Sequence, residues 1–431
     1  MTDDKNLKST LRAMGVHAEF VTLDQDVRGV LYSPVHPNEK TRIAILVMHS
    51  NVDYLTHDIL GMAQFGYTVL CANVASQYLL LDRRLRNVQA AMRFLRGAPG
   101  VQRVVLWGHS GGATLLSAYQ LIAENGPAVC QGPEKLHPCS GDLDDLLPAD
   151  GLMLIDANWG NAVMMLLSLD PALTDEDGAA ALDPSLDLFR PENGFRPGGS
   201  SFPDAFIRRF QRAQGQRSRR LIARAQQRLA RLERGEAFYT DDEPFVVAGA
   251  AQGFLNNKLF AQDVRLFAHT AAPHPLLHAD GSVTHGVVPS LRRPANDVSF
   301  TRSFYEGALI TTLRNFLAEF AVRTAEDYGY DDSRLYGVDW SSTYASPVSN
   351  VSGIRVPTLV MGMTAGLEYI ASESIYERSA SGDKSICFVE GAQHTYKTAR
   401  DCEAFPGQFG DTLALTLAHC DAWLAAPGRF L

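Results

Sequence analysis

The chain has 431 residues, of which 46% are hydrophobic, and it carries a formal net charge of −9. This length supports a large packed core and exceeds that of most single domains, which predicts either one domain with a long insertion or two domains. The negative charge disfavours nucleic acid and anionic membrane surfaces as partners, and no stretch is long and apolar enough to span a bilayer.

The first residues are polar and show no secretory signal pattern, so we expect a cytoplasmic protein whose six cysteines are reduced. Cys130 and Cys139 flank a loop rich in proline and glycine, and a disulfide between them in an oxidising compartment is the alternative. No motif for a cofactor is present, so none is expected. Four histidines lack the spacing of a metal site: His269, His274, His278 and His285.

The first third of the chain predicts alternating strands and helices. Two segments, 17–23 and 27–32, resemble a β-hairpin. Continuous apolar runs predict strands that are covered on both faces, at residues 43–48, 67–74, 104–107 and 151–156. Apolar residues at helical spacing predict helices at 79–95 and 113–124. Strands that alternate with helices indicate a mostly parallel, doubly wound α/β sheet with right-handed crossovers.

This alternation stops after the sixth predicted strand. Residues 165–344 contain helical and loop segments, among them a basic amphipathic stretch at 204–234 that predicts a solvated helix face, but no run of sheet strands. Strands and helices then resume at 356–361, 372–379, 386–389 and 412–424. Because long loops without secondary structure are uncommon, we predict a core of residues 1–164 and 346–431 with a mainly helical cap, residues 165–345, inserted in it.

The sequence GHSGG at residues 108–112 matches the pattern G-x-S-x-G. It directly follows a predicted strand and directly precedes a predicted helix, which is the context of a nucleophile elbow. The N-terminus of that helix would stabilise negative charge on the attacking oxygen. The motif in this context predicts that Ser110 is a nucleophile.

A serine hydroxyl needs a base that accepts its proton. His394 stands in the loop after the last predicted strand, and this loop emerges at the same edge of the sheet as the elbow. We therefore predict His394 as the general base.

The elbow and a Gly-x-x-His sequence after the last strand resemble the α/β-hydrolase superfamily. The resemblance covers residues 1–160 and 350–431, and no motif extends it to the cap. It implies an α/β-hydrolase fold and acyl transfer to water, with a catalytic acid as the third member of the triad.

The acid has several candidates. In most of the superfamily it follows the penultimate strand, but that loop has Ala365 and Gly366 where the aspartate is usual. Asp156 ends a buried strand, which resembles the alternative acid position of haloalkane dehalogenases and some lactone hydrolases. We predict Asp156 as the acid and keep Glu368 as an alternative. Glu373 is a further alternative, although its place near a helix start also explains its charge.

An oxyanion hole requires two preorganised donors. One is expected to be the amide of Gly111, which follows the nucleophile. The other would come from HSN at residues 49–51, which resembles the His-Gly-x element of the superfamily with Ser50 in place of glycine. We predict the Asn51 amide as this donor and His49 as a structural brace of the loop.

Together these features predict hydrolysis of a carboxylic ester or lactone of a small or medium, largely apolar compound, bound beneath the cap. Hydrolytic C–C cleavage on the same triad is one alternative, and a non-catalytic small-molecule receptor is another. Association into a homodimer is left open.

Overall fold

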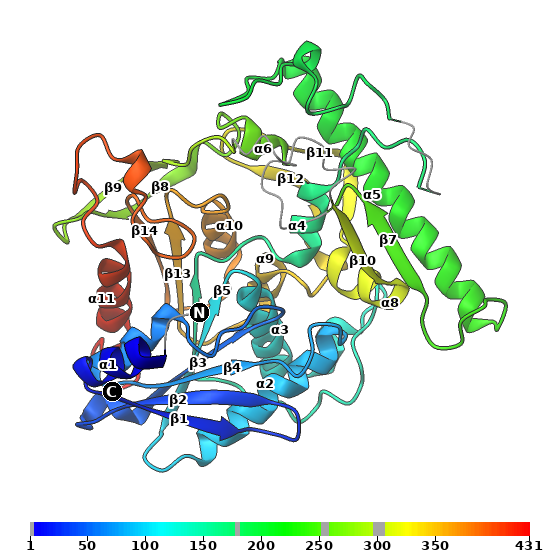
Figure 1. The fold of residues 1–431 in the computed structure, drawn as a ribbon. Helices are drawn as coiled ribbons and strands as arrows, with labels where there is room; N and C mark the ends of the chain where they lie inside the picture. Colours follow the sequence, from blue (N-terminus) through cyan, green and yellow to red (C-terminus); the bar gives the residue numbers. More distant parts are fainter. Residues whose placement is uncertain (1–3, 177–181, 251–257, 296–306) are drawn as a thin grey trace.

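The computed structural model describes residues 4–176, 182–250, 258–295 and 307–431. One ten-stranded sheet runs through the molecule, in the order β1-β2-β4-β3-β5-β6-β13-β14-β8-β9 (Figure 1). Its strands are β1 (Val16–Thr22), β2 (Arg28–Pro34), β3 (Ile43–His49), β4 (Thr68–Asn73), β5 (Arg103–His109), β6 (Gly151–Ile155), β8 (His269–Leu277), β9 (Val283–Pro289), β13 (Thr358–Met363) and β14 (Lys384–Val389).

The six central strands, from β4 to β14, are parallel. Every residue of β3 is buried, and alternate residues contribute to two hydrophobic clusters on opposite faces of the sheet. Helices α2 (Leu81–Gly97) and α3 (Gly111–Asn125) pack on one face, and η2 (Asp58–Phe65) and α11 (Thr412–Leu424) pack on the other. The predicted fold class, a doubly wound and mostly parallel sheet, is confirmed.

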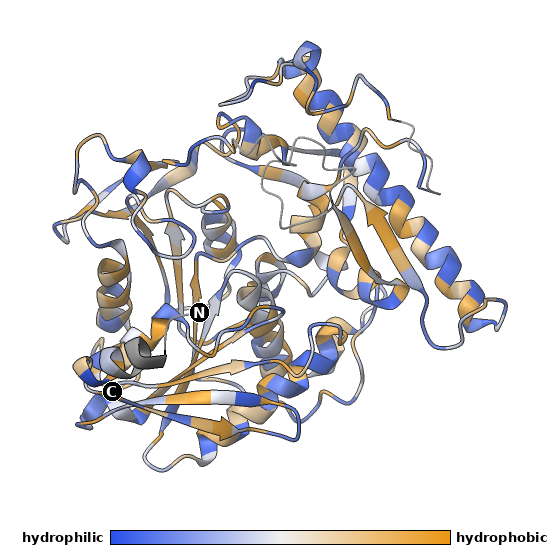
Figure 2. Cartoon of the chain, viewed as in Figure 1, coloured by the Kyte–Doolittle hydropathy of each residue, from blue (hydrophilic) through white to orange (hydrophobic). Residues whose placement is uncertain are grey.

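Helix α4 (Asn161–Ser168) leads from the core into the inserted region, which is dominated by α5 (Asp204–Glu233), a helix that lies well away from the central sheet in Figure 1. Apolar and polar residues alternate along α5, as expected for an amphipathic helix (Figure 2). Two small antiparallel sheets accompany it, made of β7 (Pro244–Ala248) with β10 (Ala308–Thr312) and of β11 (Arg323–Tyr330) with β12 (Leu335–Asp339).

The expectation that residues 165–344 contribute no strand to the main sheet is wrong. β8 pairs in parallel with β14, and β9 pairs with β8, so this hairpin forms one edge of the sheet. Prolines at positions 273, 275 and 289 obscure the strand pattern in the sequence. β9, which carries Pro289, is the edge strand, and β8 pairs with β14 only at Leu276 and Leu277, so Pro273 and Pro275 lie outside that ladder. The boundaries of the cap at 165 and 345 stay a prediction.

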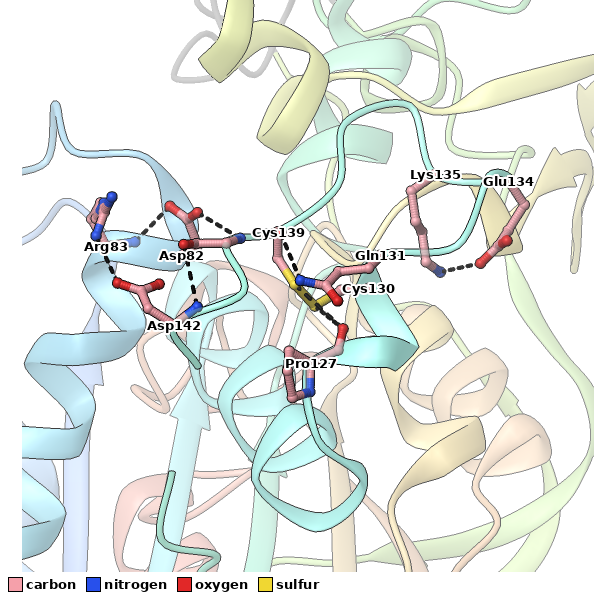
Figure 3. The surroundings of a disulfide bond; sticks show 10 residues. Asp82, Arg83, Pro127, Cys130, Gln131, Glu134, Lys135, Cys139 and Asp142 are labelled. Carbon is pink, nitrogen blue, oxygen red and sulfur yellow. Dashed lines mark hydrogen bonds and ion pairs between the residues drawn. A yellow bond between two sulfur atoms is a disulfide. The ribbon is translucent and has the colours of Figure 1, made fainter. Parts of the chain in front are cut away.

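Cys130 and Cys139 form a disulfide, which differs from the expectation of reduced thiols and realises the alternative pairing. The bond joins the end of η3 (Pro127–Cys130) to the following loop (Figure 3). The same loop is tied to α2, because the amide of Ser140 donates to the carboxylate of Asp82 at 3.1 Å. The disulfide therefore closes a loop that leads from α3 towards β6.

The remaining helical segments are short: α1 (Asp4–Ala13), η1 (Glu39–Arg42), η4 (Pro191–Asn193), α6 (Leu259–Gln262), α8 (Leu313–Asn315), η7 (Phe316–Phe320), η8 (Trp340–Ser342), α9 (Pro347–Asn350), η9 (Val351–Gly353), α10 (Ala371–Arg378) and η10 (Arg400–Cys402). Within the described ranges, no helix has both the length and the apolar character needed to cross a membrane.

Candidate active site

The nucleophile elbow forms as the strand–turn–helix sequence predicts. β5 ends at His109, Ser110 adopts the positive φ of 52° with ψ of −129°, and α3 begins at the next residue. The helix start packs against the end of β3, where a Cβ on Gly112 would lie 2.5 Å from the carbonyl oxygen of Met48. Only glycine permits this approach, which explains the final glycine of the G-x-S-x-G motif.

His394 and Asp156 lie in direct contact. The Nδ1 atom of His394 is 2.7 Å from Oδ2 of Asp156, whose side chain is fully buried. The other carboxylate oxygen, Oδ1, accepts a hydrogen bond from the amide of Met363 at 2.9 Å. Asp156 also has a positive φ of 48°. Strained backbone at a non-glycine residue is typical of functional sites, and the two hydrogen bonds hold the carboxylate in one orientation.

The two other candidate acids are placed differently. Oε2 of Glu368 is 3.7 Å from Nδ1 of His394, which is beyond hydrogen-bonding distance but close enough for a strong charge interaction. Glu373 accepts hydrogen bonds from the amides of Ala271 and Ala272, each at 2.8 Å, so it anchors β8 to α10. Of the three carboxylates, only that of Asp156 makes a hydrogen bond with His394.

The surroundings of His394 favour its protonated form. Burial by itself would lower the pKa of His394, but the hydrogen bond to Asp156 and the negative charges of Glu368 and Asp156 outweigh burial and raise the pKa to about 9. Lys258 lies near Glu368 and is fully buried. Burial lowers the pKa of Lys258 to about 8, and the charge of Glu368 partly opposes this shift. A cation and an anion thus accompany the acid–histidine pair.

His109, the residue before the nucleophile, braces the site. Its Nε2 atom donates to the carbonyl oxygen of His394 at 2.7 Å, and its Nδ1 atom accepts from the hydroxyl of Tyr54 at 2.6 Å. A carbonyl oxygen only accepts, so this pair of bonds assigns the proton to Nε2. Burial lowers the pKa of His109 well below its usual value, so the ring is neutral. The sequence did not predict this bridge, and its one signal was a histidine at the variable position before the serine of the G-x-S-x-G motif.

The loop after β3 lies beside the elbow, and its two candidate oxyanion donors, the Asn51 amide and the Ser50 hydroxyl, differ in whether they already have an acceptor. The amide of Asn51 donates to Nδ1 of His49 at 3.2 Å, so this amide already has an acceptor and His49 braces the loop. Ser50 is 1% exposed, and its hydroxyl has no hydrogen-bond partner within the described part of the chain. Its Oγ lies 3.1 Å from where a Cβ on Gly111 would stand. The Ser50 hydroxyl is therefore a donor without an acceptor among the described residues, and it lies close to Gly111.

Three of the four histidines considered above as metal ligands lie close to carboxylates at the sheet edge. His274 lies 2.9 Å from Glu373, His278 lies 2.7 Å from Glu390, and His269 lies 3.6 Å from Asp332. These contacts tie β8 to its surroundings, and the ring of His274 is buried with its carboxylate partner.

No family model matches the chain, and no curated protein matches it. Several solved structures are similar in fold. The siderophore hydrolase EstB from Aspergillus fumigatus is 12% identical, with 96% of this chain and 98% of that chain covered and a TM-score of 0.45. Est1E from Butyrivibrio proteoclasticus is 12% identical, with 94% and 97% covered and a TM-score of 0.37. The α/β hydrolase GrgF from Penicillium sp. sh18 is 11% identical, with 95% and 98% covered and a TM-score of 0.40.

The chain's own geometry carries the assignment of the fold. Ser110 follows β5 in a sharp turn, Asp156 follows the adjacent strand β6, and His394 follows the later strand β14. Their order along the chain is serine, aspartate and histidine, and all three stand beyond the carboxyl ends of parallel strands. By strand order, elbow and acid–histidine pair, the chain has the α/β-hydrolase fold.

Proposed function

We propose that the protein is a serine hydrolase that cleaves a carboxylic ester or lactone through an acyl-enzyme on Ser110. The observation that carries this proposal is the 2.7 Å contact between His394 Nδ1 and the buried Asp156 carboxylate at the sheet edge that bears the elbow. A buried carboxylate fixes the imidazole tautomer and leaves Nε2 to act as the base.

In the proposed reaction, the hydroxyl oxygen of Ser110 attacks the substrate carbonyl carbon while His394 accepts the hydroxyl proton. Asp156 stabilises the imidazolium that forms. Collapse of the tetrahedral intermediate breaks the ester bond, and the proton passes from His394 to the leaving alkoxide. A water molecule then attacks the acyl-enzyme, again with His394 as the base, and releases the acid and Ser110.

The tetrahedral intermediate needs two donors for its oxyanion. We retain the Gly111 amide as the first donor. For the second, the Ser50 hydroxyl is a better candidate than the Asn51 amide, because the latter is engaged by His49. The low polarity of a buried position would make the hydroxyl's hydrogen bond to a developing charge strong.

Labelling with a fluorophosphonate tests the proposal directly. We expect one adduct on Ser110 of the folded protein and none in a Ser110→Ala variant of equal thermal stability. The labelled site is located by peptide mass spectrometry. No adduct on Ser110 would contradict the hydrolase function and favour a non-catalytic receptor.

The reaction type is tested by offering aryl esters, lactones and vinylogous diketones side by side. We expect hydrolysis of esters or lactones, followed by release of the acid. Cleavage of the diketones alone would replace ester hydrolysis with C–C bond hydrolysis on the same triad.

A further inference from the structure

A cavity with both polar and apolar walls lies between the core and the inserted region. It has a volume of about 220 Å³ and is walled on the core side by Asn51, Arg84 and Asn161. These residues belong to the loop after β3 and to the starts of α2 and α4, and β3 and β6 are the two neighbours of β5 in the sheet. The cavity therefore opens at the sheet edge that bears Ser110.

The opposite wall comes from β10, α8 and η7, the last of which is a π-helical turn. Such turns are rare and are frequent at functional sites. η7 carries Glu319, which forms an ion pair with Arg84 across the boundary between the core and the insertion. Both side chains are at most 2% exposed.

The charges of this pair are fully compensated. Arg84 also donates to the carbonyl oxygens of Ser50 and Leu79, at 3.2 and 3.0 Å. The second carboxylate oxygen of Glu319 accepts from Nδ2 of Asn161 at 2.6 Å. This ion pair therefore gives the wall no net charge, which favours neither an anionic nor a cationic ligand. The bond to Ser50 also ties the cavity wall to the residue beside Gly111.

One wall residue lacks a partner for its acceptor. Asn315 is 9% exposed, and its Nδ2 donates to Oγ1 of Thr311 at 3.0 Å. Its Oδ1 has no hydrogen-bond partner among the described residues. A buried amide oxygen without a donor is costly, and such groups call for a specific explanation. Asn315 is one of the residues that line the cavity, so a hydroxyl group bound there would supply the missing donor.

We propose that this cavity is a substrate subsite that binds a neutral, hydroxyl-bearing part of the ester, with Asn315 Oδ1 accepting the hydroxyl proton. The proposal rests on the proposed function and narrows it, since the sequence alone suggested a largely apolar substrate. The cavity has room for roughly seven water-sized groups at about 30 Å³ each, which matches a short hydroxyacyl chain or a small polyol.

Two isosteric substrate pairs test the subsite on either side of the scissile bond. Phenyl 3-hydroxybutyrate is compared with phenyl isovalerate, and glycerol 1-butyrate with 2-methylbutyl butyrate, so that each hydroxyl is replaced by a methyl group of similar size. We expect kcat/KM for one hydroxylated ester to exceed that of its isostere by about tenfold, the range of one good hydrogen bond. Phenyl hydrogen succinate serves as the anionic comparison and is expected to be the poorest phenyl ester.

The Asn315→Leu variant should reduce the ratio of kcat/KM between the hydroxylated ester and its isostere to near unity, with thermal unfolding as the control for folding. Asn315→Asp keeps an acceptor oxygen and should retain the preference. Equal rates for both members of each pair in the natural protein would overturn the subsite, as would a preference that survives in Asn315→Leu. If Ser110 is labelled and phenyl isovalerate is hydrolysed in either case, the hydrolase function stands while the subsite falls. Without labelling, the hydrolase function itself fails.

Discussion

The carboxylate of Asp156 lies where a side chain on residue 366 would begin. A Cβ on Gly366 would stand 3.0 Å from Oδ2 of Asp156 and 2.9 Å from the carbonyl oxygen of Met363. The acid at the end of β6 and a side chain on the loop after β13 therefore compete for one space. This explains why the loop carries glycine where an aspartate is usual, since a side chain at residue 366 would collide with the carboxylate of Asp156.

The acid can be identified by two amide substitutions. Asp156→Asn should lower kcat by about 10⁴-fold, because an amide at Oδ2 no longer holds the required tautomer of His394. Glu368→Gln should leave kcat within a few-fold at high pH, since Glu368 makes no hydrogen bond to the ring. Steady-state hydrolysis of an aryl ester measures both, with circular dichroism as the control for folding. A collapse of activity in Glu368→Gln alone would move the acid to the later loop.

The rate should depend on pH through His394, whose pKa is raised to about 9. Below that pH the imidazole is protonated and cannot accept the proton of Ser110, so kcat/KM should rise with pH and level off above about 9. Glu368→Gln removes one of the charges that raise this pKa, so the midpoint should move to lower pH and activity near neutrality should increase. An unchanged midpoint in this variant would contradict the charge interaction.

Protonation of His394 should also contribute to the free energy of unfolding. The folded-state pKa of His394 exceeds the ordinary value of 6.5, so the protonated ring is stabilised by folding. This contribution is fully present below the ordinary pKa and is lost as the pH rises through about 9. Denaturant unfolding across this range should show a smaller pH-dependent loss in Asp156→Asn than in the natural protein.

The Ser50 hydroxyl can be tested against a matched buried hydroxyl. Ser50→Ala should lower kcat by about 10²-fold with little change in KM, as for the loss of one oxyanion donor. Thr114 on α3 also has a buried hydroxyl without a partner in the described structure, and Thr114→Val should leave kcat unchanged. Equal and small effects of the two substitutions would return the role to the Asn51 amide.

Because α3 packs closely on β3, adding one methyl group at Gly112 should lower the stability of the protein. Gly112→Ala should destabilise the protein by about 1–3 kcal/mol, because the Cβ meets the Met48 backbone rather than a flexible side chain. Gly97, the last residue of α2, has open space where a Cβ would stand. Gly97→Ala is therefore the control, and its unfolding midpoint should be unchanged or higher. Similar midpoints for both variants would refute the close contact.

The disulfide is expected to stabilise the loop between α3 and β6. Its cysteines are nine residues apart, which corresponds to roughly 2–3 kcal/mol in the chain-entropy account of such loops. The double variant with serine at positions 130 and 139 should show this loss in denaturant unfolding under non-reducing conditions. The natural protein should approach the variant's stability when dithiothreitol is added. Mass spectrometry that finds both thiols free would rule out the bond.

Local patterns in the sequence determined the central strands and the elbow. Runs of apolar residues predict buried parallel strands because both faces are covered, and G-x-S-x-G between a strand and a helix requires the sharp turn at Ser110. Strands that alternate with helices predict parallel strands, whose carboxyl ends meet at one edge of the sheet, so Asp156 and His394 could be placed at that edge in advance.

Tertiary structure alone decided what depends on contacts between distant segments. The proline-containing hairpin β8–β9 joins the main sheet through the pairing of β8 with β14. The preference of His394 for Asp156 over Glu368 is a difference of 1.0 Å between two distances across the sheet edge, 2.7 against 3.7 Å. The ion pair of Arg84 with Glu319 joins residues 235 positions apart. Composition and periodicity report burial along one element, whereas hydrogen bonds and cavities arise from the relative placement of several.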